Sequence, residues 1–393
     1  LADLQALGEI GRTPAGGLAR TTFSAADFAG REWFRQRVLD AGLQFYEDGA
    51  GNLSAILGES GPTILFGSHL DTVPNGGRYD GALGVLSALE ALRTIQETGI
   101  VPPVRLEVIS FTDEEGTHSS MIGSRAVTGA LTPDDLLPIQ HVLTPTPYTP
   151  ASILAAKRNP TDYRAFLEVH IEQGKRLERA GIDIGVVTNI VGIRHFWLAF
   201  TGQANHSGTT PMDQRTDALW GAAEFVGRGK TLVMERFTPG VMNCGDVQVA
   251  PGAHNIVPGQ VRLAFEIRHG TTAQMDDMEQ VLFALAQETA DQYHLRLSIE
   301  SLGHVVPAEL DDQVIAAIER AAATLNLSHT RLMSFAGHDT QNMSRFTPSA
   351  MFFVPSVAGF SHNPQEFTRD QDVINAANVV LQTVLHLIEA TDQ

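Results

Sequence analysis

The stretch that decides the fold is Val104-Arg105-Leu106-Glu107-Val108-Ile109-Ser110-Phe111-Thr112-Asp113-Glu114-Glu115-Gly116, an apolar run closed by three successive acids. Carboxylates at the end of a buried strand repel one another and lose hydration. Such a cluster persists when a cation lies against it, or when one carboxyl group keeps its proton for chemistry. The stretch therefore predicts a buried strand whose end belongs to a metal or catalytic site.

A second apolar run, residues 64–71, ends in His69 and Asp71 and is followed by Asp80 in a glycine-rich loop. Side chains two apart point to the same side of a strand, so His69 could bind a metal while Asp71 holds the other ring nitrogen. The alternatives are a core histidine beside an N-capping aspartate, and an N-cap role for Asp80. Two strand ends that bring His, Asp and Glu to one rim predict a metal site in an α/β enzyme.

The composition sets outer limits on function. A chain of 393 residues, 43% hydrophobic and 18% charged, is typical of a soluble globular protein with two domains. The formal charge of −18, from 27 Lys+Arg and 45 Asp+Glu, argues against binding to nucleic acid or to anionic membranes. The single cysteine, Cys244, excludes an intrachain disulfide and a multi-thiolate zinc site. Without a long apolar stretch or a signal-peptide pattern, we expect a cytoplasmic protein.

Strands alternate with helices in the first part of the chain. The hydrophobic patterns predict a helix then a strand over 24–57, a strand at 62–68, a helix at about 82–97, a strand at 104–111, a helix near 121–130, a proline-rich loop at 144–150 and a helix over 162–179 that carries Glu168, His170 and Glu172. This order indicates an α/β fold, in which a mixed, mostly parallel sheet has helices on both faces.

The pattern changes near residue 190. It predicts a strand at 191–201, a helix at 211–236, strands at 241–250 and 257–269, a helix at 273–293, an extended segment at 295–302, a helix at 313–325, a strand at 350–354 and a C-terminal helix at about 371–390. The β-α-β-β-α-β order within this part matches a ferredoxin-like layout. We therefore expect a discontinuous catalytic domain, residues 1–190 and 308–393, with an inserted α+β domain at 191–307.

Glu114 and Glu115 carry the strongest chemical signal. Adjacent glutamates are usually a solvated surface pair, but here they follow the buried strand almost directly. One could bind a metal while the other takes a proton from the attacking water. His170 and His362 add two imidazoles, although each also suits a polar loop or a helix face. His, Asp and Glu ligands without cysteine suit two Zn²⁺, Mn²⁺ or similar ions.

These motifs resemble those of the dinuclear metallo-amidohydrolases related to aminoacylase and the carboxypeptidase G-type peptidases. More narrowly, they are similar to the amidase–hydantoinase–carbamoylase branch, which includes N-carbamoyl-L-amino acid hydrolase, β-ureidopropionase and allantoate amidohydrolase. The matching stretches keep the family's order over nearly the whole chain and are residues 67–73, 75–81, 113–116, 168–174, 205–212, 255–259, 336–339 and 361–364.

The resemblance implies a role for each matching residue. Asp80 would bridge two divalent ions (Zn²⁺, Mn²⁺ or Co²⁺), one also bound by His69 and His170, the other by Glu115 and His362. Glu114 would be the general base and then acid, and Asp71 would orient a ligand. The substrate would contact Gln173 through its ureido group, His206 and Asn255 at the scissile group, and Arg268 through its carboxylate. An exposed ion pair is the alternative for Arg268.

The resemblance implies hydrolysis of the carbamoyl (ureido) amide of an N-carbamoyl-L-amino acid. Allantoate amidohydrolase is the alternative activity, and an aminoacylase or peptidase is a weaker one. A serine hydrolase is not supported because the chain contains no G-x-S-x-G. The inserted domain would act as a lid and would form a homodimer. Residues 117–120, Thr-His-Ser-Ser, depart from the family pattern and leave the side-chain preference open.

Overall fold

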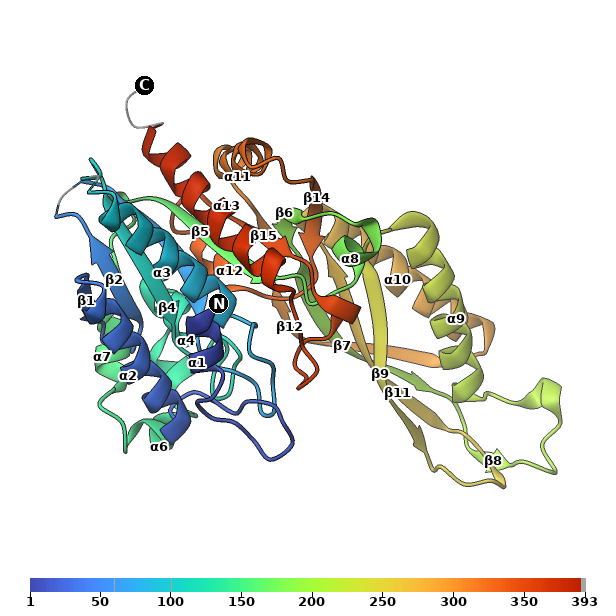
Figure 1. Cartoon of the computed structure of the whole chain (residues 1–393). Helices are drawn as coiled ribbons and strands as arrows, with labels where there is room; N and C mark the ends of the chain where they lie inside the picture. Colours follow the sequence, from blue (N-terminus) through green and yellow to red (C-terminus); the bar gives the residue numbers. More distant parts are fainter. Residues whose placement is uncertain (60, 100, 390–393) are drawn as a thin grey trace. The chain divides into compact units, whose positions relative to one another are not determined.

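The computed structural model describes residues 1–59, 61–99 and 101–389 (Figure 1). The chain divides into two compact units. The first unit consists of Leu1–Thr188, Leu310–Leu332 and Gly337–Gln393, and the second of Asn189–Glu309 and Met333–Ala336. The lid and dimerisation roles expected of the inserted part stay predictions.

The helices of the first unit differ widely in length. They are α1 (Ala2–Leu7), α2 (Ala25–Asp40), α3 (Ala82–Glu97), α4 (Ile122–Thr128), α5 (Pro133–Leu136), α6 (Gln140–Leu143), α7 (Pro150–Ala155), α8 (Arg176–Ala180), α11 (Asp312–Thr324), α12 (Asp339–Met343) and α13 (Asp370–Glu389), with 3-10 turns η1 (Pro160–Asp162) and η3 (Val357–Gly359). The last residue predicted for the C-terminal helix, 390, lies outside the described residues.

A nine-stranded sheet forms the centre of this arrangement. Its strands are β1 (Gln44–Glu47), β2 (Leu53–Leu57), β3 (Thr63–His69), β4 (Arg105–Phe111), β5 (Tyr163–Ile171), β6 (Ile184–Ile190), β13 (Ala308–Glu309), β14 (His329–Ser334) and β15 (Ser349–Val354). The order is β1-β2-β4-β3-β5-β15-β6-β13, with β14 paired to β6. The central strands β4, β3, β5 and β15 are parallel, and the pairings β1–β2, β2–β4, β15–β6 and β6–β13 are antiparallel. The predicted mixed α/β fold class is confirmed.

Helices pack on both faces of the central strands. In Figure 1, α3 and α13 run side by side across the sheet, and Gly84 of α3 approaches Ser68 so closely that an added Cβ would lie 2.7 Å from its Cβ. Leu65 points to the opposite face, because side chains alternate along a strand, and there it packs with Val127 of α4 and Met343 of α12. Both faces of the parallel strands are thus buried, as a parallel sheet requires.

One predicted element is wrong. Residues 162–179 were expected as a helix, but they form strand β5 (Tyr163–Ile171) and the short helix α8. Residues 165–171 of this strand are buried throughout, between β3 and β15, so its sequence lacks the alternation of a half-exposed strand. Two buried polar residues, Glu168 and His170, interrupt its apolar run. Strands β6, β13 and β14 were not predicted at all.

The second unit contains a separate four-stranded antiparallel sheet. Its elements are β7 (Gly192–Thr201), β8 (Asn205–His206), η2 (Met212–Gln214), α9 (Ala218–Arg236), β9 (Val241–Ala250), β10 (Ile256–Val257), β11 (Gln260–His269), α10 (Thr272–Gln292) and β12 (Arg296–Val305). The sheet order is β12-β7-β11-β9, and β8 pairs with β10 in a small second ribbon. The predicted helix at 211–236 begins later, at Ala218, because Asp217 caps it by accepting the Leu219 N–H.

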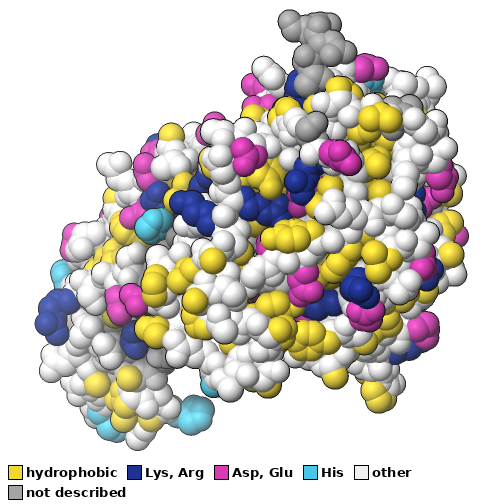
Figure 2. Space-filling view, turned by 90° about the vertical axis from the view of Figure 1, so that its left-hand side faces the viewer, with side chains coloured by type: hydrophobic (Ala, Val, Ile, Leu, Met, Phe, Trp, Pro, Cys, Tyr) yellow, Lys and Arg dark blue, Asp and Glu magenta, His cyan; other side chains and the backbone are white. Residues whose placement is uncertain are grey.

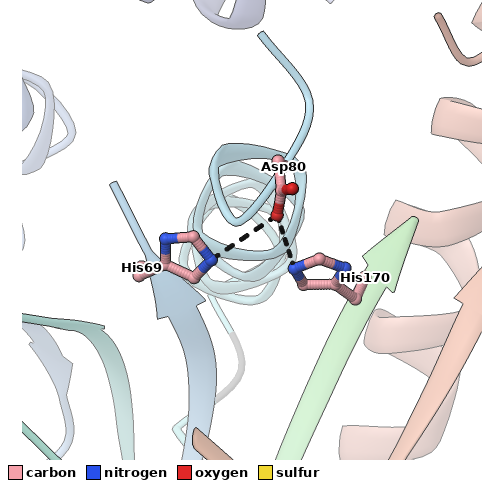
Figure 3. A group of neighbouring side chains, drawn as sticks. All are labelled: His69, Asp80 and His170. Carbon is pink, nitrogen blue, oxygen red and sulfur yellow. Dashed lines mark ion pairs between the residues drawn. The ribbon is translucent and has the colours of Figure 1, made fainter. Parts of the chain in front are cut away.

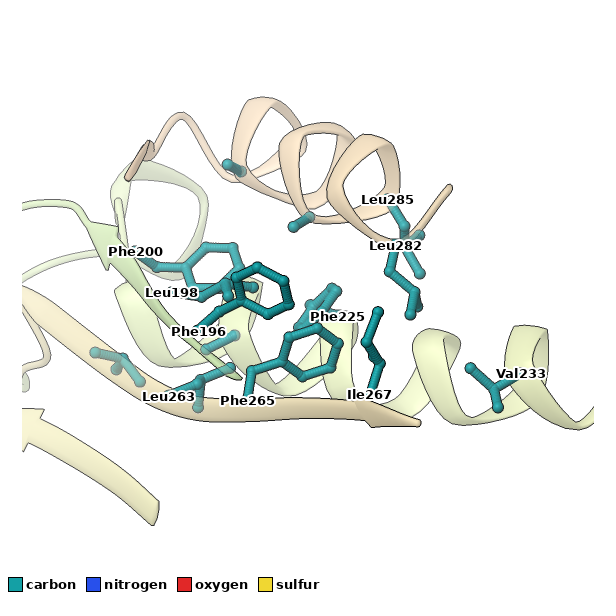
Figure 4. Packing of buried hydrophobic residues seen from close by; sticks show 14 of the residues in the cluster. Phe196, Leu198, Phe200, Phe225, Val233, Leu263, Phe265, Ile267, Leu282 and Leu285 are labelled. Atoms are coloured by element: carbon teal, nitrogen blue, oxygen red, sulfur yellow. The ribbon is translucent and has the colours of Figure 1, made fainter. Parts of the chain in front are cut away.

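Aromatic side chains fill the space between this sheet and its two helices. Figure 4 shows Phe196 and Phe265 of the sheet packed against Phe225 of α9 and Leu282 of α10. Phe225 lies edge-on to Phe265 with ring centroids 5.5 Å apart, a favoured aromatic geometry. The second unit therefore has a hydrophobic core of its own.

Figure 2 shows basic, acidic and hydrophobic side chains interspersed over one face. Within the described ranges, no helix combines the length and the apolarity that a membrane crossing needs.

Candidate metal centre

Two histidines and one aspartate meet at the carboxyl ends of the parallel strands (Figure 3). His69 is the last residue of β3, His170 lies near the end of the adjacent strand β5, and Asp80 precedes α3. The Oδ1 atom of Asp80 lies 2.9 Å from Nε2 of His170 and 3.7 Å from Nε2 of His69. All three side chains are buried. These residues form the first of two groups of potential metal ligands.

The second group shares Asp80. Its other carboxylate oxygen, Oδ2, lies 3.4 Å from Nε2 of His362, and that nitrogen lies 3.3 Å from Oε2 of Glu115. The two oxygens of one carboxylate therefore face two different sets of ligand atoms. This is the arrangement that a carboxylate bridging two ions would need.

The hydrogen bonds of the two buried histidines fix which ring nitrogen is offered. Nδ1 of His69 lies 3.1 Å from the carbonyl oxygen of Asp71, and Nδ1 of His170 lies 2.9 Å from that of Ile171. A carbonyl oxygen only accepts, so each Nδ1 carries the hydrogen. In the neutral ring, Nε2 then presents its lone pair to the cluster, as a metal ligand must.

The residues present fit a divalent ion. Ligand atoms that lie about 2.0–2.2 Å from one tetrahedral ion are roughly 3.4 Å from each other. The separations around Asp80, from 2.9 to 3.7 Å, lie around this value. Among the residues that the structure describes, the buried atoms Nε2 of His69 and Oε1 of Glu115 form no hydrogen bond. Imidazole and carboxylate donors together suit Zn²⁺, Mn²⁺ or Co²⁺.

Asp80 does not cap the helix that follows it. The N-cap of α3 is Gly81, and no side chain accepts a hydrogen bond there. Gly81 has φ 64°, and an added Cβ would lie 2.4 Å from the ring of His69. The glycine therefore serves both the turn and the close approach of the ring. The carboxylate of Asp80 contacts His170 and His362 and does not cap α3, so the alternative interpretation of an N-cap is wrong.

Glu114 is buried beside the first group. Its Oε2 atom lies 3.6 Å from Nε2 of His69, and its residue is 9% exposed, so it is not a solvated surface acid. Burial raises the pKa of Glu114 well above its usual range, and the nearby His69 opposes the rise. A bound cation would lower that pKa again. A carboxylate poised in this way can accept a proton and later return it.

Asp71 accepts hydrogen bonds beneath the cluster. Its Oδ2 atom accepts from the hydroxyl of Thr22 at 3.1 Å and from the N–H of Glu115 at 3.3 Å. Its Oδ1 atom lies 3.6 Å from Nδ1 of His69. The sequence placed the carboxylate of Asp71 on this ring nitrogen, but the shorter contact comes from its backbone carbonyl. Asp71 thus contacts both the first strand end and the acidic cluster.

The segment that departs from the family pattern contacts the same region. Nε2 of His118 donates to the carbonyl oxygen of Thr22 at 2.9 Å, and its ring stacks on Phe23 with centroids 5.7 Å apart. The N–H groups of His118 and Ser119 donate to Oδ2 of Asp113. The segment is therefore fixed by specific contacts, and Thr22 links it to Asp71.

Gln173 lies against the shared carboxylate. Its Nε2 donates to Oδ2 of Asp80 at 3.0 Å and to the hydroxyl of Ser361 at 3.2 Å. Its Oε1 is buried and accepts no hydrogen bond among the described residues. Glu172, its neighbour, instead caps α8 by accepting the N–H groups of Arg176 and Leu177.

His206 and Asn255 lie in the second unit on neighbouring segments. The N–H of Ser207 donates to the carbonyl oxygen of Asn255, and β8 pairs with β10 next to it. Nδ1 of His206 accepts from the N–H groups of Gly208 and Thr209 at 3.1 and 3.2 Å. In a neutral ring the hydrogen is then on Nε2, which becomes a donor. His206 is exposed, as a substrate contact would be.

Arg268 also lies in the second unit and is part of an ion pair. Its Nε donates to Oε1 of Glu266 at 2.7 Å and its Nη1 to the carbonyl oxygen of Phe335 at 3.0 Å. The other oxygen of Glu266 lies 2.8 Å from Nε2 of His195. The ion pair that was the alternative role for Arg268 is thus present, and the Arg268 side chain is 30% exposed. This ion pair also orients the guanidinium group.

Several residues of the site were missed from the sequence. Glu168 accepts hydrogen bonds from the hydroxyl of Ser68 and from the N–H and hydroxyl of Thr340. These bonds connect β5, which carries His170, with β3 and α12. Glu366 and Ser361 lie beside Asp80. The sequence shows only that Glu366 is an acid near His362, and its pairing with the N–H groups of Tyr79 and Asp80 has no sequence signal.

Comparisons with known proteins find relatives over nearly the whole chain. The chain is 35% identical to the N-carbamoyl-L-amino acid amidohydrolase of Geobacillus stearothermophilus, over 98% of this chain and 97% of that protein. It is 33% identical to the allantoate amidohydrolase of Bacillus subtilis, over 92% of this chain and 90% of that protein. It shares a TM-score of 0.88 and 34% identity with a hydantoinase/carbamoylase family amidase from Burkholderia ambifaria, over 98% and 96% of the two chains.

The match to the broader family extends over most of the chain. Residues 65–386 match peptidase family M20/M25/M40, a span that contains all the candidate metal ligands. Relatives that match at nearly full length include amidohydrolases and a hydantoinase/carbamoylase amidase. The chain therefore belongs to peptidase family M20/M25/M40, within its amidase–hydantoinase–carbamoylase branch.

Proposed function

We propose that this protein is a metal-dependent amidohydrolase that cleaves the carbamoyl (ureido) amide of an N-carbamoyl-L-amino acid. One water is consumed, and the products are the L-amino acid, carbon dioxide and ammonia. The observation that carries the proposal is the shared carboxylate of Asp80, which faces two ligand groups beside the buried Glu114. The 35% identity to an N-carbamoyl-L-amino acid amidohydrolase supports the choice of substrate.

The proposal includes two divalent ions per chain, Zn²⁺, Mn²⁺ or Co²⁺. Asp80 would be shared, His69 and His170 would complete one site, and Glu115 and His362 the other. When bound, the ions polarise the ureido carbonyl and lower the pKa of the attacking water. The lone pairs that His69 and His170 present through Nε2 support this assignment.

The remaining steps belong to side chains of the chain itself. Glu114 would accept a proton from water at its carboxylate and return it to the departing nitrogen. Oε1 of Gln173, buried and without a hydrogen bond among the described residues, would accept an N–H of the ureido group. His206 would donate from Nε2 to the developing oxyanion, and Asn255 would bind at the same group. Asp71 would keep His69 in place.

Allantoate hydrolysis is the second candidate function. It is supported by 33% identity to an allantoate amidohydrolase, and allantoate is likewise a ureido carboxylate. A carboxylate clamp and a contact to the ureido group serve both substrates equally. The contacts of His118, in the segment 117–120 that departs from the family pattern, favour neither substrate over the other.

Ammonia release from a panel of substrates tests the proposal. We expect the protein, loaded with divalent metal, to release ammonia from at least one N-carbamoyl-L-amino acid. Allantoate should react more slowly, and N-acetyl amino acids and dipeptides should not react, because they lack the second ureido nitrogen that Gln173 would bind. Preferred cleavage of allantoate would favour the second function, and cleavage of dipeptides alone would refute both.

Arg268 is the proposed clamp for the substrate carboxylate. With a formal charge of −18, the protein repels an approaching carboxylate unless a local cation binds it. Glu266 and Phe335 occupy Nε and Nη1 of Arg268, so the planar group is held with one edge left to a ligand. A lysine nitrogen cannot make the protein contacts and a two-pronged substrate contact together. We expect Arg268→Lys to lower kcat/KM. The loss should correspond to ~1.5–3 kcal/mol of transition-state stabilisation, the scale of a charge-assisted hydrogen bond.

Arg262→Lys is the matched control for this change. Arg262 lies on the same strand, over the ring of Trp197, and its replacement should leave kcat/KM unaltered. Removing the carboxylate from the substrate should impair the wild type strongly and Arg268→Lys much less. If both proteins lose equally from that removal, Arg268 is only a surface ion pair.

We also propose that the protein is a homodimer joined through the second unit. Strands β9 and β12 are the edges of its sheet and expose Val247 (50%), Val249 (36%) and Leu302 (51%). Exposed apolar sheet edges readily pair with a second chain. Sedimentation equilibrium should give twice the chain mass of 42.4 kDa, and a monomer would refute this.

A cytoplasmic location completes the proposal. It is supported by a chain with one cysteine, Cys244, which needs no oxidising compartment. Fractionation of cells that express the protein would test it, and recovery outside the cytoplasm would contradict it.

A further inference from the structure

Glu366 is a buried acid that has no role in the steps described so far. Its residue is 5% exposed, and it lies four positions after His362. Its Oε1 atom accepts two backbone hydrogen bonds, from Tyr79 at 2.8 Å and from Asp80 at 3.1 Å. The acid therefore holds the backbone that carries the shared carboxylate.

The other oxygen of Glu366 faces the segment of His362. Ser361 lies with its hydroxyl 3.4 Å from Oε2 of Glu366 and donates to Oδ2 of Asp80 at 2.8 Å. Glu366, Ser361 and Asp80 thus form a closed set of contacts between two segments that are 281 positions apart. One segment supplies the shared ligand and the other supplies a ligand of the second group.

Gly77 makes room for this acid. A Cβ added at Gly77 would lie 2.1 Å from Oε1 of Glu366 and 2.2 Å from its Cδ. Contacts this short do not occur, so any side chain at position 77 would displace Glu366. Position 77 needs a glycine because the backbone there lies directly against the Glu366 side chain.

We propose that Glu366 is a positioning residue that couples the two ion sites, by fixing the Asp80 loop and the Ser361–His362 segment against each other. Without Glu366 the two segments keep their ligands and the contacts of Ser361 and Gln173 with Asp80, but they lose the acid that contacts both. Asp80 would then still contact His170, while His362 would be held less firmly opposite Oδ2 of Asp80. The inference rests on the two-ion centre of the proposed function and not on the identity of the substrate.

Metal binding by the metal-depleted protein tests this coupling without any substrate. Titrations with Zn²⁺ followed by calorimetry would compare the wild type with Glu366→Ala and Gly77→Ala. Loss of a residue that orients a ligand typically weakens metal binding by ~10–100-fold, so each of these variants should weaken at least one Zn²⁺ site by at least ~10-fold.

Two further variants separate positioning from general damage. Glu366→Gln keeps an oxygen that accepts both N–H groups and places an amide beside Ser361, so it should bind both ions nearly as the wild type does. Gly227→Ala should leave the affinity for Zn²⁺ unchanged, since a Cβ added at Gly227 would have no neighbouring atom within 4 Å. Thermal unfolding of each variant would verify that it is folded.

The outcomes distinguish the inference from the proposed function. A wild-type protein that binds no divalent ion would refute both. Two ions bound equally well by the wild type and by folded Glu366→Ala would refute the inference alone.

Discussion

Replacing Glu114 by glutamine should lower kcat by at least ~10²-fold, the usual scale for a positioned general base. The amide keeps the shape of the side chain but cannot accept the proton. Glu114 lies outside both ligand groups, so the metal content should not change. Steady-state kinetics and elemental analysis of the same preparation measure both quantities.

Glu115→Gln is the control that makes this result specific. Glu115 belongs to the second ligand group, where its Oε2 lies 3.3 Å from Nε2 of His362. This variant should lose affinity for one ion, and added metal should restore part of its turnover. If Glu114→Gln loses metal and Glu115→Gln keeps it, the roles of the two acids are the reverse of those proposed.

Removing the divalent ions should abolish turnover altogether. Neither ligand group is complete without Asp80, so the two proposed ions would be held through one carboxylate. Uncatalysed attack of neutral water on a ureido carbonyl is slow, and a carboxylate base such as Glu114 does not by itself lower the pKa of the attacking water to near neutral. Exhaustive chelation should therefore give an inactive but folded protein, as measured by ammonia release and circular dichroism. Substantial turnover by that protein would contradict the proposed mechanism.

The positions of the strand-end residues could be predicted from the sequence, because they depend on local rules. The apolar run that ends at His69 and the run that ends before Glu114 became the parallel neighbours β3 and β4, with His69 paired to Phe111. Parallel strands end at one edge, so their polar ends had to meet. Asp80 was harder, since an aspartate before a helix is often a cap, and only the structure shows that Gly81 is the N-cap of α3 and that no side chain caps this helix.

Strand β5 could not be predicted, because burial on both faces removes the alternation by which strands are recognised. Glu168 and His170 interrupt the apolar run of the segment, although both are buried between neighbouring strands. Hydrogen bonds from Ser68 and Thr340 compensate Glu168, and those partners come from distant segments. The error thus arose from tertiary contacts that local patterns do not contain.

The contacts of Glu366 were hidden for a similar reason. Its partners Tyr79 and Asp80 are 287 and 286 positions away, and only backbone N–H groups are involved. No pattern of side chains announces such a pairing. In contrast, Glu266 stands two positions before Arg268 on the same face of β11, so that ion pair was available to the sequence argument.

The most direct test of the two-ion amidohydrolase is a titration of the metal-depleted protein with Zn²⁺ or Mn²⁺ during turnover of an N-carbamoyl-L-amino acid. Ammonia release and bound metal would be measured at each point. We expect no release without metal and a rise that levels off when two ions are bound per chain. Full activity in protein that elemental analysis shows to be free of metal, or a plateau at one bound ion, would contradict the account.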